Sequence, residues 1–270
     1  VKVLQMHGIE NAFGIIGSAM MPISDLFPQA GITFWDAAHE CNAGMMADGF
    51  TRATGKMSMM VAQNGPGITN FVTPVKTAYW NHTPLLLVTP QAANKTLGQG
   101  GFQEVEQMAL FKDMVAYQEE VRDPTRIAET LNRVILQAKR ASAPAQINIP
   151  RDFWTQIIDI ELPAIVEFER PSGGEDAISQ AAALLSEAKF PVLLNGAGVV
   201  IGGAIDASMK LAERLDAPVC CGYQHNDAFP GSHPLFAGPL GYNGSKAGME
   251  LIAKADVVLA LGTRLNPFST

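Results

Sequence analysis

The chain of 270 residues carries 19 basic and 26 acidic side chains, a net charge of −7, and 47% of its residues are hydrophobic. These values exclude a disordered chain, argue against a nucleic-acid-binding surface, and predict a folded two-domain protein, with a small-molecule enzyme as the default expectation. No apolar run reaches the roughly 18 residues of a membrane span, no signal peptide is visible, and the three cysteines lack metal-type spacing, so we expect reduced thiols in a cytoplasm.

The first 159 residues predict one parallel-sheet domain with helices on both faces. The expected elements are a helix end over 1–7, a strand over 11–16, a short helix over 20–27, a strand over 32–35, a helix from Glu40 that ends at Gly55, a strand over 57–62, an amphipathic segment over 69–80, a strand over 85–88, a helix opening at Phe102-Gln103-Glu104, a helix over 125–140 and a strand over 145–149. Acidic residues over 104–120 indicate a solvated helix face. The repeated strand–helix order favours parallel pairing with right-handed crossovers.

A second, Rossmann-like α/β domain is predicted over 175–270, after a linker over 160–174 that holds two prolines and two glycines. Its expected elements are a helix over 175–188, a strand over 192–194, a glycine turn over 195–198, a helix over 204–215, a strand over 219–221, a long loop, a helix over 246–254 and a strand over 257–261. A dinucleotide-binding turn would need a third glycine at position 201, where Ile201 stands. A tight strand–helix turn is therefore the favoured interpretation.

Glu40 lies at the predicted start of a helix, next to the end of a predicted strand. Open parallel sheets build their ligand sites at this edge, but a lone carboxylate there is by default a helix-dipole residue. The pair His39-Glu40 is not a zinc-protease motif, because Ala43 stands where the second histidine is required. Gly65-Pro66-Gly67, before Thr69-Asn70, offers free backbone N–H groups to a ligand.

Four stretches taken together carry a resemblance to a known family: His39-Glu40, ADGFTRATG over 47–55, NGPGITN over 64–70, and GFQE over 101–104. Their order and spacing resemble the pyrimidine-binding domain of thiamine-diphosphate enzymes of the acetolactate synthase and pyruvate oxidase group. The part of the chain after Glu175 is similar to the central domain of these enzymes. The resemblance covers essentially the whole chain and implies an enzyme with thiamine diphosphate and Mg²⁺ as cofactors.

Within this group, FGIIGSAMMP over 13–22, TPVKTAYWNHTP over 73–84 and CCGYQHND over 220–227 look most like acyltransferases that act on sulfoacetaldehyde and phosphate. Acetolactate synthases usually have Gly-Gly where this chain has Gly17-Ser18, and Asp-Ser where it has Asn81-His82. The resemblance therefore implies a substrate other than a 2-oxo acid, with acetyl phosphate and sulfite as products. An acetolactate-synthase-like carboligase or decarboxylase remains an alternative, as does a non-catalytic binding or assembly module.

The resemblance also assigns roles to individual residues. Glu40 would be catalytic, as the carboxylate beside the aminopyrimidine N1′ through which the cofactor activates its thiazolium C2. The residues expected to bind the cofactor are Ile16, Gly17, Pro66, Asn70 and Gln103. The weaker candidates for the substrate pocket are Ser18, His39, Asn81, His82 and Phe102.

A characteristic part of the family is missing from this chain. The family binds diphosphate and Mg²⁺ through a Gly-Asp-Gly motif, whereas Asp48-Gly49 follows Ala47 and belongs to the predicted helix. We therefore expect a fragment, truncated at both ends, that lacks the diphosphate domain, holds no metal ligand and is inactive alone. The family resemblance implies a homo-oligomer with active sites between subunits. FAD binding is not predicted.

Overall fold

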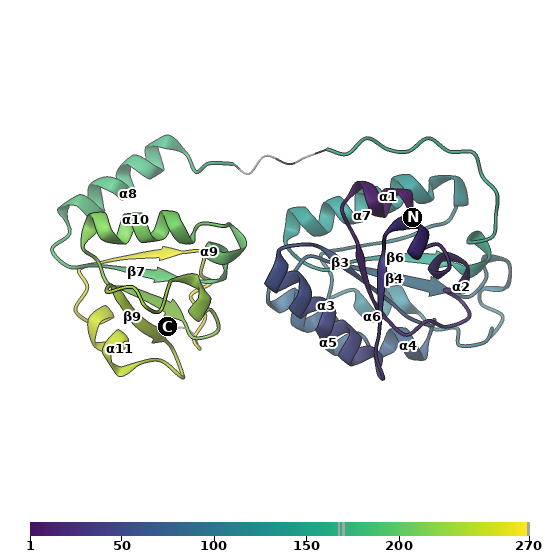
Figure 1. The fold of residues 1–270 in the computed structure, drawn as a ribbon, viewed down its shortest axis with the longest axis horizontal. Coiled ribbons are helices and arrows are strands. Elements are labelled where there is room, and N and C mark those ends of the chain that lie inside the picture. The colour runs from purple at the N-terminus through teal and green to yellow at the C-terminus, as the bar shows by residue number, and fades with distance from the viewer. Residues whose placement is uncertain (167, 169–170, 269–270) are drawn as a thin grey trace. The chain divides into compact units, whose positions relative to one another are not determined.

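The computed structural model describes residues 1–166, 168 and 171–268. Its contacts divide the chain into two units, residues 1–168 and 169–270. Each unit contains a parallel β-sheet with helices packed on both faces (Figure 1). The predicted α/β class is therefore confirmed.

The first unit is organised around a six-stranded sheet with the order β2-β1-β3-β4-β6-β5, in which every pairing is parallel. The strands are β1 (Asn11–Gly14), β2 (Thr33–Asp36), β3 (Ser58–Val61), β4 (Leu85–Gln91), β5 (Tyr117–Glu120) and β6 (Ala145–Pro150). Strands β3, β4 and β6 are buried along their whole length, as strands covered on both faces are. Strand β6 also buries the polar side chains of Gln146 and Asn148, which are hydrogen-bonded.

The helices of this unit form two layers, one on each face of the sheet. They are α1 (Lys2–Met6), α2 (Met21–Ser24), α3 (Glu40–Thr54), α4 (Pro66–Thr69), α5 (Val72–Trp80), α6 (Gln107–Phe111) and α7 (Ile127–Ala141), with short 3-10 turns at Pro28–Ala30, Asn94–Thr96, Pro124–Arg126 and Arg151–Phe153. Helices α1 and α7 pack into the core on one face, and α3 and α5 pack into the core on the other (Figure 1).

The sequence-based prediction was wrong at three places in this unit. No helix opens at Phe102, because Gln103 has a left-handed backbone (φ +57°) and α6 begins only at Gln107. The acidic stretch that was interpreted as a helix face contains strand β5 instead. Strand β4 also continues through Pro90, which pairs with Ile149 of β6 beyond the last residue of β4 that pairs with β3, Val88.

The second unit contains a four-stranded parallel sheet with the order β10-β7-β8-β9. Its elements are α8 (Glu175–Glu187), β7 (Pro191–Asn195), α9 (Ala197–Ile201), α10 (Ile205–Leu215), β8 (Val219–Gly222), a 3-10 turn (Asn226–Ala228), β9 (Phe236–Leu240), α11 (Lys246–Ile252) and β10 (Val257–Leu261). Helix α10 packs on one face and α11 on the other (Figure 1). The long loop that the sequence predicted before α11 contains strand β9, so this prediction was incomplete.

Among the described residues, no helix combines the length and the apolar character that crossing a membrane demands.

Candidate functional site

The carboxyl edge of the first sheet is where the predicted site residues converge. In the order β2-β1-β3-β4, the chain leaves β1 toward β2 on one side and returns to β3 on the other. The crevice beyond the carboxyl ends of β1 and β3 is therefore a topological switch point, the usual position of a ligand site in an open parallel sheet. Residues 15–19 follow β1, residues 62–65 follow β3, and helix α3 begins after β2.

Helix α3 places Glu40 at this edge. His39 is its N-cap, with an extended backbone (φ −155°, ψ 140°), and its Nδ1 accepts a hydrogen bond of 3.1 Å from the Cys41 N–H. The helix ends at Gly55, whose φ of +71° confirms the predicted left-handed cap. Glu40 is thus the first residue of a well-capped helix of 15 residues, where the helix dipole stabilises a carboxylate.

The Glu40 carboxylate is held by the loop after β3. Its Oε2 atom accepts a hydrogen bond of 2.9 Å from Nδ2 of Asn70, the residue that ends α4. A Cβ atom added at Gly67 would lie 3.3 Å from Oε1 of Glu40. The glycine therefore leaves space beside the second carboxylate oxygen, while Asn70 fixes the first. Glu40 and Asn70, predicted as catalytic and cofactor-binding residues, are brought together.

Gln63, which follows β3, joins the loop after β1 to the loop before α6. Its Oε1 atom accepts a hydrogen bond of 3.0 Å from the Ala19 N–H, and its Nε2 atom donates one of 2.9 Å to Oε1 of Gln103. The side chain passes directly over Gly17, where an added Cβ would lie 2.2 Å from the Gln63 Oε1 atom. Gly17 and Gln103, both predicted to bind the cofactor, are therefore linked through a residue that the sequence did not single out.

A second close approach fixes the turn that precedes α4. Gly65 has φ +70° and ψ −109°, and a Cβ atom there would lie 2.4 Å from the backbone oxygen of Gln103. Its N–H donates to Oε1 of the buried Gln107 at 2.9 Å, and Nε2 of Gln107 donates to Oδ1 of Asn148 at 3.0 Å. The Gly65 turn is thus anchored to the sheet through Gln107.

The remaining predicted residues divide into two groups. Ser18, Ile16 and Phe102 lie exposed in the loops at the carboxyl edge, with Phe102 72% exposed, and Pro66 is the exposed first residue of α4. Asn81 and His82 do not join them: they follow α5 and precede β4, whose first residue pairs with the first residue of β3. They lie at the amino edge, separated from the site by the length of β3, about 13 Å.

Sequence reasoning assigned no role to Gln63, Asn64 or Gln107, although Asn64 begins the NGPGITN stretch. The signal that could have identified the first two is a pair of amide side chains directly after a fully buried strand, at the switch point. Gln107 carries no local signal, because its role follows from burial between β4, β6 and the Gly65 turn.

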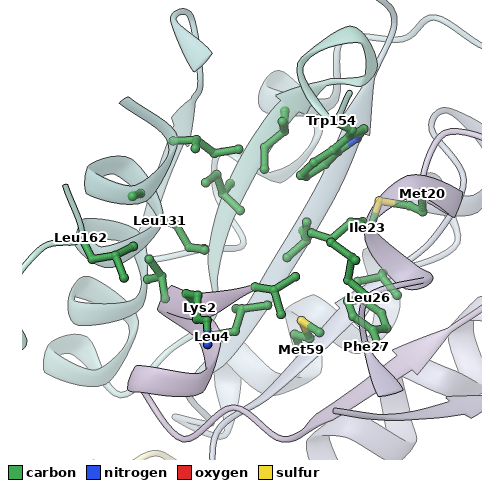
Figure 2. A pocket seen from close by; sticks show the side chains of 18 of the residues that line it. Lys2, Leu4, Met20, Ile23, Leu26, Phe27, Met59, Leu131, Trp154 and Leu162 are labelled. Carbon is green, nitrogen blue, oxygen red and sulfur yellow. The ribbon is translucent and has the colours of Figure 1, made fainter. Parts of the chain in front are cut away.

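A cavity of about 310 Å³ lies on the face of the sheet covered by α1 and α7, and it is a different feature of the unit (Figure 2). Its lining is almost entirely apolar, from Leu4, Met20, Phe27, Leu131 and Trp154 among others, and it includes no predicted site residue. Apart from Lys2, the side chains of this lining carry no group for acid–base chemistry. The polar edge, not this cavity, is the candidate site.

The comparisons with known proteins identify the family. Residues 1–110 match the thiamine pyrophosphate enzyme, N-terminal TPP binding domain, and residues 178–270 match the thiamine pyrophosphate enzyme, central domain. The chain belongs to the thiamine pyrophosphate enzymes. The family resemblance inferred from the sequence is thus confirmed.

Several relatives of this thiamine pyrophosphate enzyme match along its whole length. It is 85% identical over 270 residues to a sulfoacetaldehyde acetyltransferase of Roseovarius nubinhibens and 75% identical to one of Rhodobacter capsulatus, covering 100% of this chain and 45% and 46% of those proteins. A "Probable acetolactate synthase large subunit" of Methanocaldococcus jannaschii is 34% identical, over 98% of this chain and 46% of that protein. The chain therefore spans about half the length of the curated relatives that it matches.

A solved structure shows the same fold. The thiamine diphosphate-dependent 4-hydroxybenzoylformate decarboxylase of Rhodococcus jostii RHA1 matches with a TM-score of 0.85 and 25% identity, over 96% of this chain and 50% of that chain.

The carboxyl edge of this thiamine pyrophosphate enzyme fits the aminopyrimidine half of the cofactor. The ring would need one carboxylate at N1′, and the Glu40 carboxylate, which accepts a hydrogen bond from Asn70 and has space beside it at Gly67, has the chemistry for that position. Within the described residues, no three His, Cys, Asp or Glu side chains gather in a way that could hold a metal ion.

Proposed function

We propose that this chain is part of a sulfoacetaldehyde acetyltransferase, which converts sulfoacetaldehyde and phosphate to acetyl phosphate and sulfite. In this proposal residues 1–159 form the pyrimidine-binding domain, residues 160–174 the linker, and residues 175–270 part of the central domain. The diphosphate and Mg²⁺ are held by a domain outside the chain, and the active site forms between subunits of a cytoplasmic homo-oligomer. The inferred substrate derives from the 85% and 75% identity to proteins of that name.

One observation carries the mechanism: the Glu40 carboxylate at the start of α3, with Asn70 bonded to one of its oxygens. Thiamine diphosphate, when bound, supplies a nucleophilic carbon and an electron sink for breaking a bond next to a carbonyl group. Glu40 holds the proton at N1′ of the aminopyrimidine, and Asn70 keeps the carboxylate from rotating away. Of the pocket candidates, Ser18 and Phe102 lie at this edge and can approach the substrate. His39 contributes mainly as the N-cap of α3, which begins at Glu40.

Two parallel assays of the full-length protein separate the proposed activity from the alternative. Sulfoacetaldehyde with phosphate is expected to give equal amounts of sulfite and acetyl phosphate, because the carbon–sulfur bond breaks and phosphate accepts the acetyl group. Pyruvate is expected to release no CO₂. Release of CO₂ from pyruvate without sulfite in the first assay would establish a 2-oxo acid decarboxylase or carboligase instead. The 270-residue chain alone serves as the inactive reference.

The role of Glu40 is tested by Glu40→Gln in the full-length protein. The amide cannot hold the N1′ proton as the carboxylate does, so exchange of the cofactor C2 proton is expected to slow by about 100-fold or more. The matched control is Glu175→Gln, since Glu175 also begins a helix but lies exposed in the second unit. Exchange at a near-normal rate in Glu40→Gln would remove Glu40 from the catalytic role.

A further inference from the structure

The carboxamide of Gln63 has both of its ends in use. Its Oε1 atom accepts from the Ala19 N–H at 3.0 Å, and its Nε2 atom donates to Oδ1 of Asn64 at 2.7 Å and to Oε1 of Gln103 at 2.9 Å. One acceptor bond and two donor bonds connect three separate loops. This side chain therefore has a defined direction, with oxygen toward the loop after β1 and nitrogen toward Gln103.

This direction is imposed from two independent sides, although oxygen and nitrogen of an amide have similar shapes. At one side, the Ala19 N–H can only donate, so the Gln63 atom facing it has to be oxygen. At the other, Asn64 Nδ2 lies 3.2 Å from the Phe102 carbonyl and 3.0 Å from the Gln103 carbonyl, which only accept. Asn64 therefore turns its oxygen to Gln63, which has to present N–H groups there.

The same logic extends to the Gln103 side chain. Because Gln63 presents a donor, Gln103 has to turn its oxygen toward Gln63 and its Nε2 away from it. None of the hydrogen bonds found between described residues uses the Nε2 group of Gln103 as donor. Gln103 also has a left-handed backbone, at φ +57°, in the loop packed against Gly65. The edge thus offers an N–H₂ group, with a fixed direction, to a ligand.

We propose that Gln63 is a positioning residue that sets the polarity of the site: it orients Gln103 so that Nε2 donates a hydrogen bond to a substrate oxygen. In the proposed function, on which this inference rests, the acceptor is an oxygen of the substrate sulfonate. An anionic oxygen gains more from a fixed N–H donor than a neutral oxygen does. A reversed Gln103 would present its own oxygen to the sulfonate and repel it.

The substitution Gln63→Glu reverses the polarity with almost no change in shape. The carboxylate still accepts from the Ala19 N–H but cannot donate, so Gln103 is expected to turn its Nε2 toward residue 63 and its oxygen into the site. The full-length protein, loaded with thiamine diphosphate and Mg²⁺, is titrated with the unreactive probe 2-hydroxyethanesulfonate in a calorimeter, and KM for sulfoacetaldehyde is measured in parallel. We expect the dissociation constant of the probe and the KM for sulfoacetaldehyde each to rise about tenfold, which corresponds to the loss of one charged hydrogen bond.

The new negative charge could also repel the sulfonate directly, and a double-mutant cycle separates the two effects. Gln103→Ala alone is expected to weaken probe binding about tenfold. If polarity is transmitted through Gln103, adding Gln63→Glu to that variant changes binding by less than about twofold, because the two effects are not additive. Gln5→Glu is the matched control for the substitution itself, since the exposed Gln5 side chain donates to the Ala30 carbonyl, away from the site.

Three results would overturn the inference. They are probe binding by Gln63→Glu within twofold of wild type, unchanged probe binding by Gln103→Ala, or a tenfold loss of probe binding when Gln63→Glu is added to Gln103→Ala. If Gln63→Glu does not fold, Gln63→Met replaces it in the same cycle; it frees Gln103 to rotate, and a loss of about threefold that disappears with Gln103→Ala is expected. A wild-type enzyme that releases no sulfite from sulfoacetaldehyde contradicts the proposed function. If the wild-type enzyme turns over sulfoacetaldehyde normally but the effects of Gln63→Glu and Gln103→Ala on probe binding are additive, only the role of Gln63 is contradicted.

Discussion

Gly65 and Gly55 form a matched pair for testing how closely the loops of the site are packed. Their φ angles are +70° and +71°, but their surroundings differ. A Cβ atom at Gly55 would meet nothing within 4 Å, whereas one at Gly65 would lie 2.4 Å from the backbone oxygen of Gln103. Gly55→Ala therefore tests only the backbone strain of a positive φ in alanine, whereas Gly65→Ala adds a collision of the new Cβ atom with the Gln103 backbone.

The expected costs follow from these values. At Gly55 the ψ of 0° is close to the left-handed helical region, so Gly55→Ala is expected to destabilise the fold by about 1 kcal/mol. At Gly65 the ψ of −109° lies outside that region, which costs about 1–3 kcal/mol. The Gln103 backbone must also move by roughly 1 Å, at a cost of about 1–3 kcal/mol for an overpacked site. Gly65→Ala is therefore expected to cost about 2–6 kcal/mol.

The measurement is the free energy of unfolding of the first unit in urea, for wild type and both variants. The signal is the near-ultraviolet circular dichroism of its tryptophans, since Trp35, Trp80 and Trp154 all lie before residue 169. Equal losses in Gly65→Ala and Gly55→Ala would refute the reasoning, because the collision with Gln103 would then contribute nothing. A larger loss at Gly55 would refute it as well.

Two further predictions concern groups away from the site. The hydrogen bonds from Arg133 hold the pKa of Glu119 below its ordinary value of 4.5, so the pair stabilises the fold above about pH 4.5, and this stabilisation is lost as the pH falls through the lowered pKa. Glu119→Gln is therefore expected to flatten the acidic part of a plot of the free energy of unfolding in urea against pH. An unchanged slope in that variant would contradict the prediction. Burial raises the pKa of Cys220 to about 11 and of Cys221 to about 12. At pH 8 a thiol reagent is therefore expected to modify the partly exposed Cys41 first and to reach the two buried cysteines only in denaturant. Equal rates of modification at all three cysteines would contradict this order.

The parallel sheet could be predicted because the information is local. Apolar runs mark β3 and the first part of β4, and the capped helix from Glu40 to Gly55 was placed correctly at both ends. Strand β5 was missed because it is an edge strand of half-buried polar residues, YQEE, with no apolar alternation. The expected helix at Gln103 failed for a long-range reason: Asn64 binds the carbonyl groups of residues 102 and 103, which a helix would need for itself.

The site residues likewise divide into those that local sequence identifies and those that depend on long-range contacts. Glu40 and Asn70 were named from motifs, and the structure brings them within 2.9 Å, although they are 30 residues apart in the chain. Gln63 could not be named, because a glutamine after a strand has no preferred partner until the fold brings Ala19 and Gln103 to it. Motifs thus identify groups that act on a ligand, whereas groups that orient other groups require the three-dimensional contacts.

The glycines of this edge explain why such contacts are possible. A Cβ atom at Gly14 would lie 1.7 Å from the backbone oxygen of Val61, and one at Gly17 would lie 2.2 Å from the Gln63 side chain. The approach at Gly14 joins the ends of strands β1 and β3, and those at Gly17 and Gly65 let the loops after β1, β3 and β4 touch each other directly. A displacement of one loop must therefore displace the others, because protein interiors are close-packed. The Asn70 amide that holds Glu40 and the amide direction at Gln103 consequently depend on the same packed unit, so a substitution at any of these glycines is expected to disturb both ends of the site together.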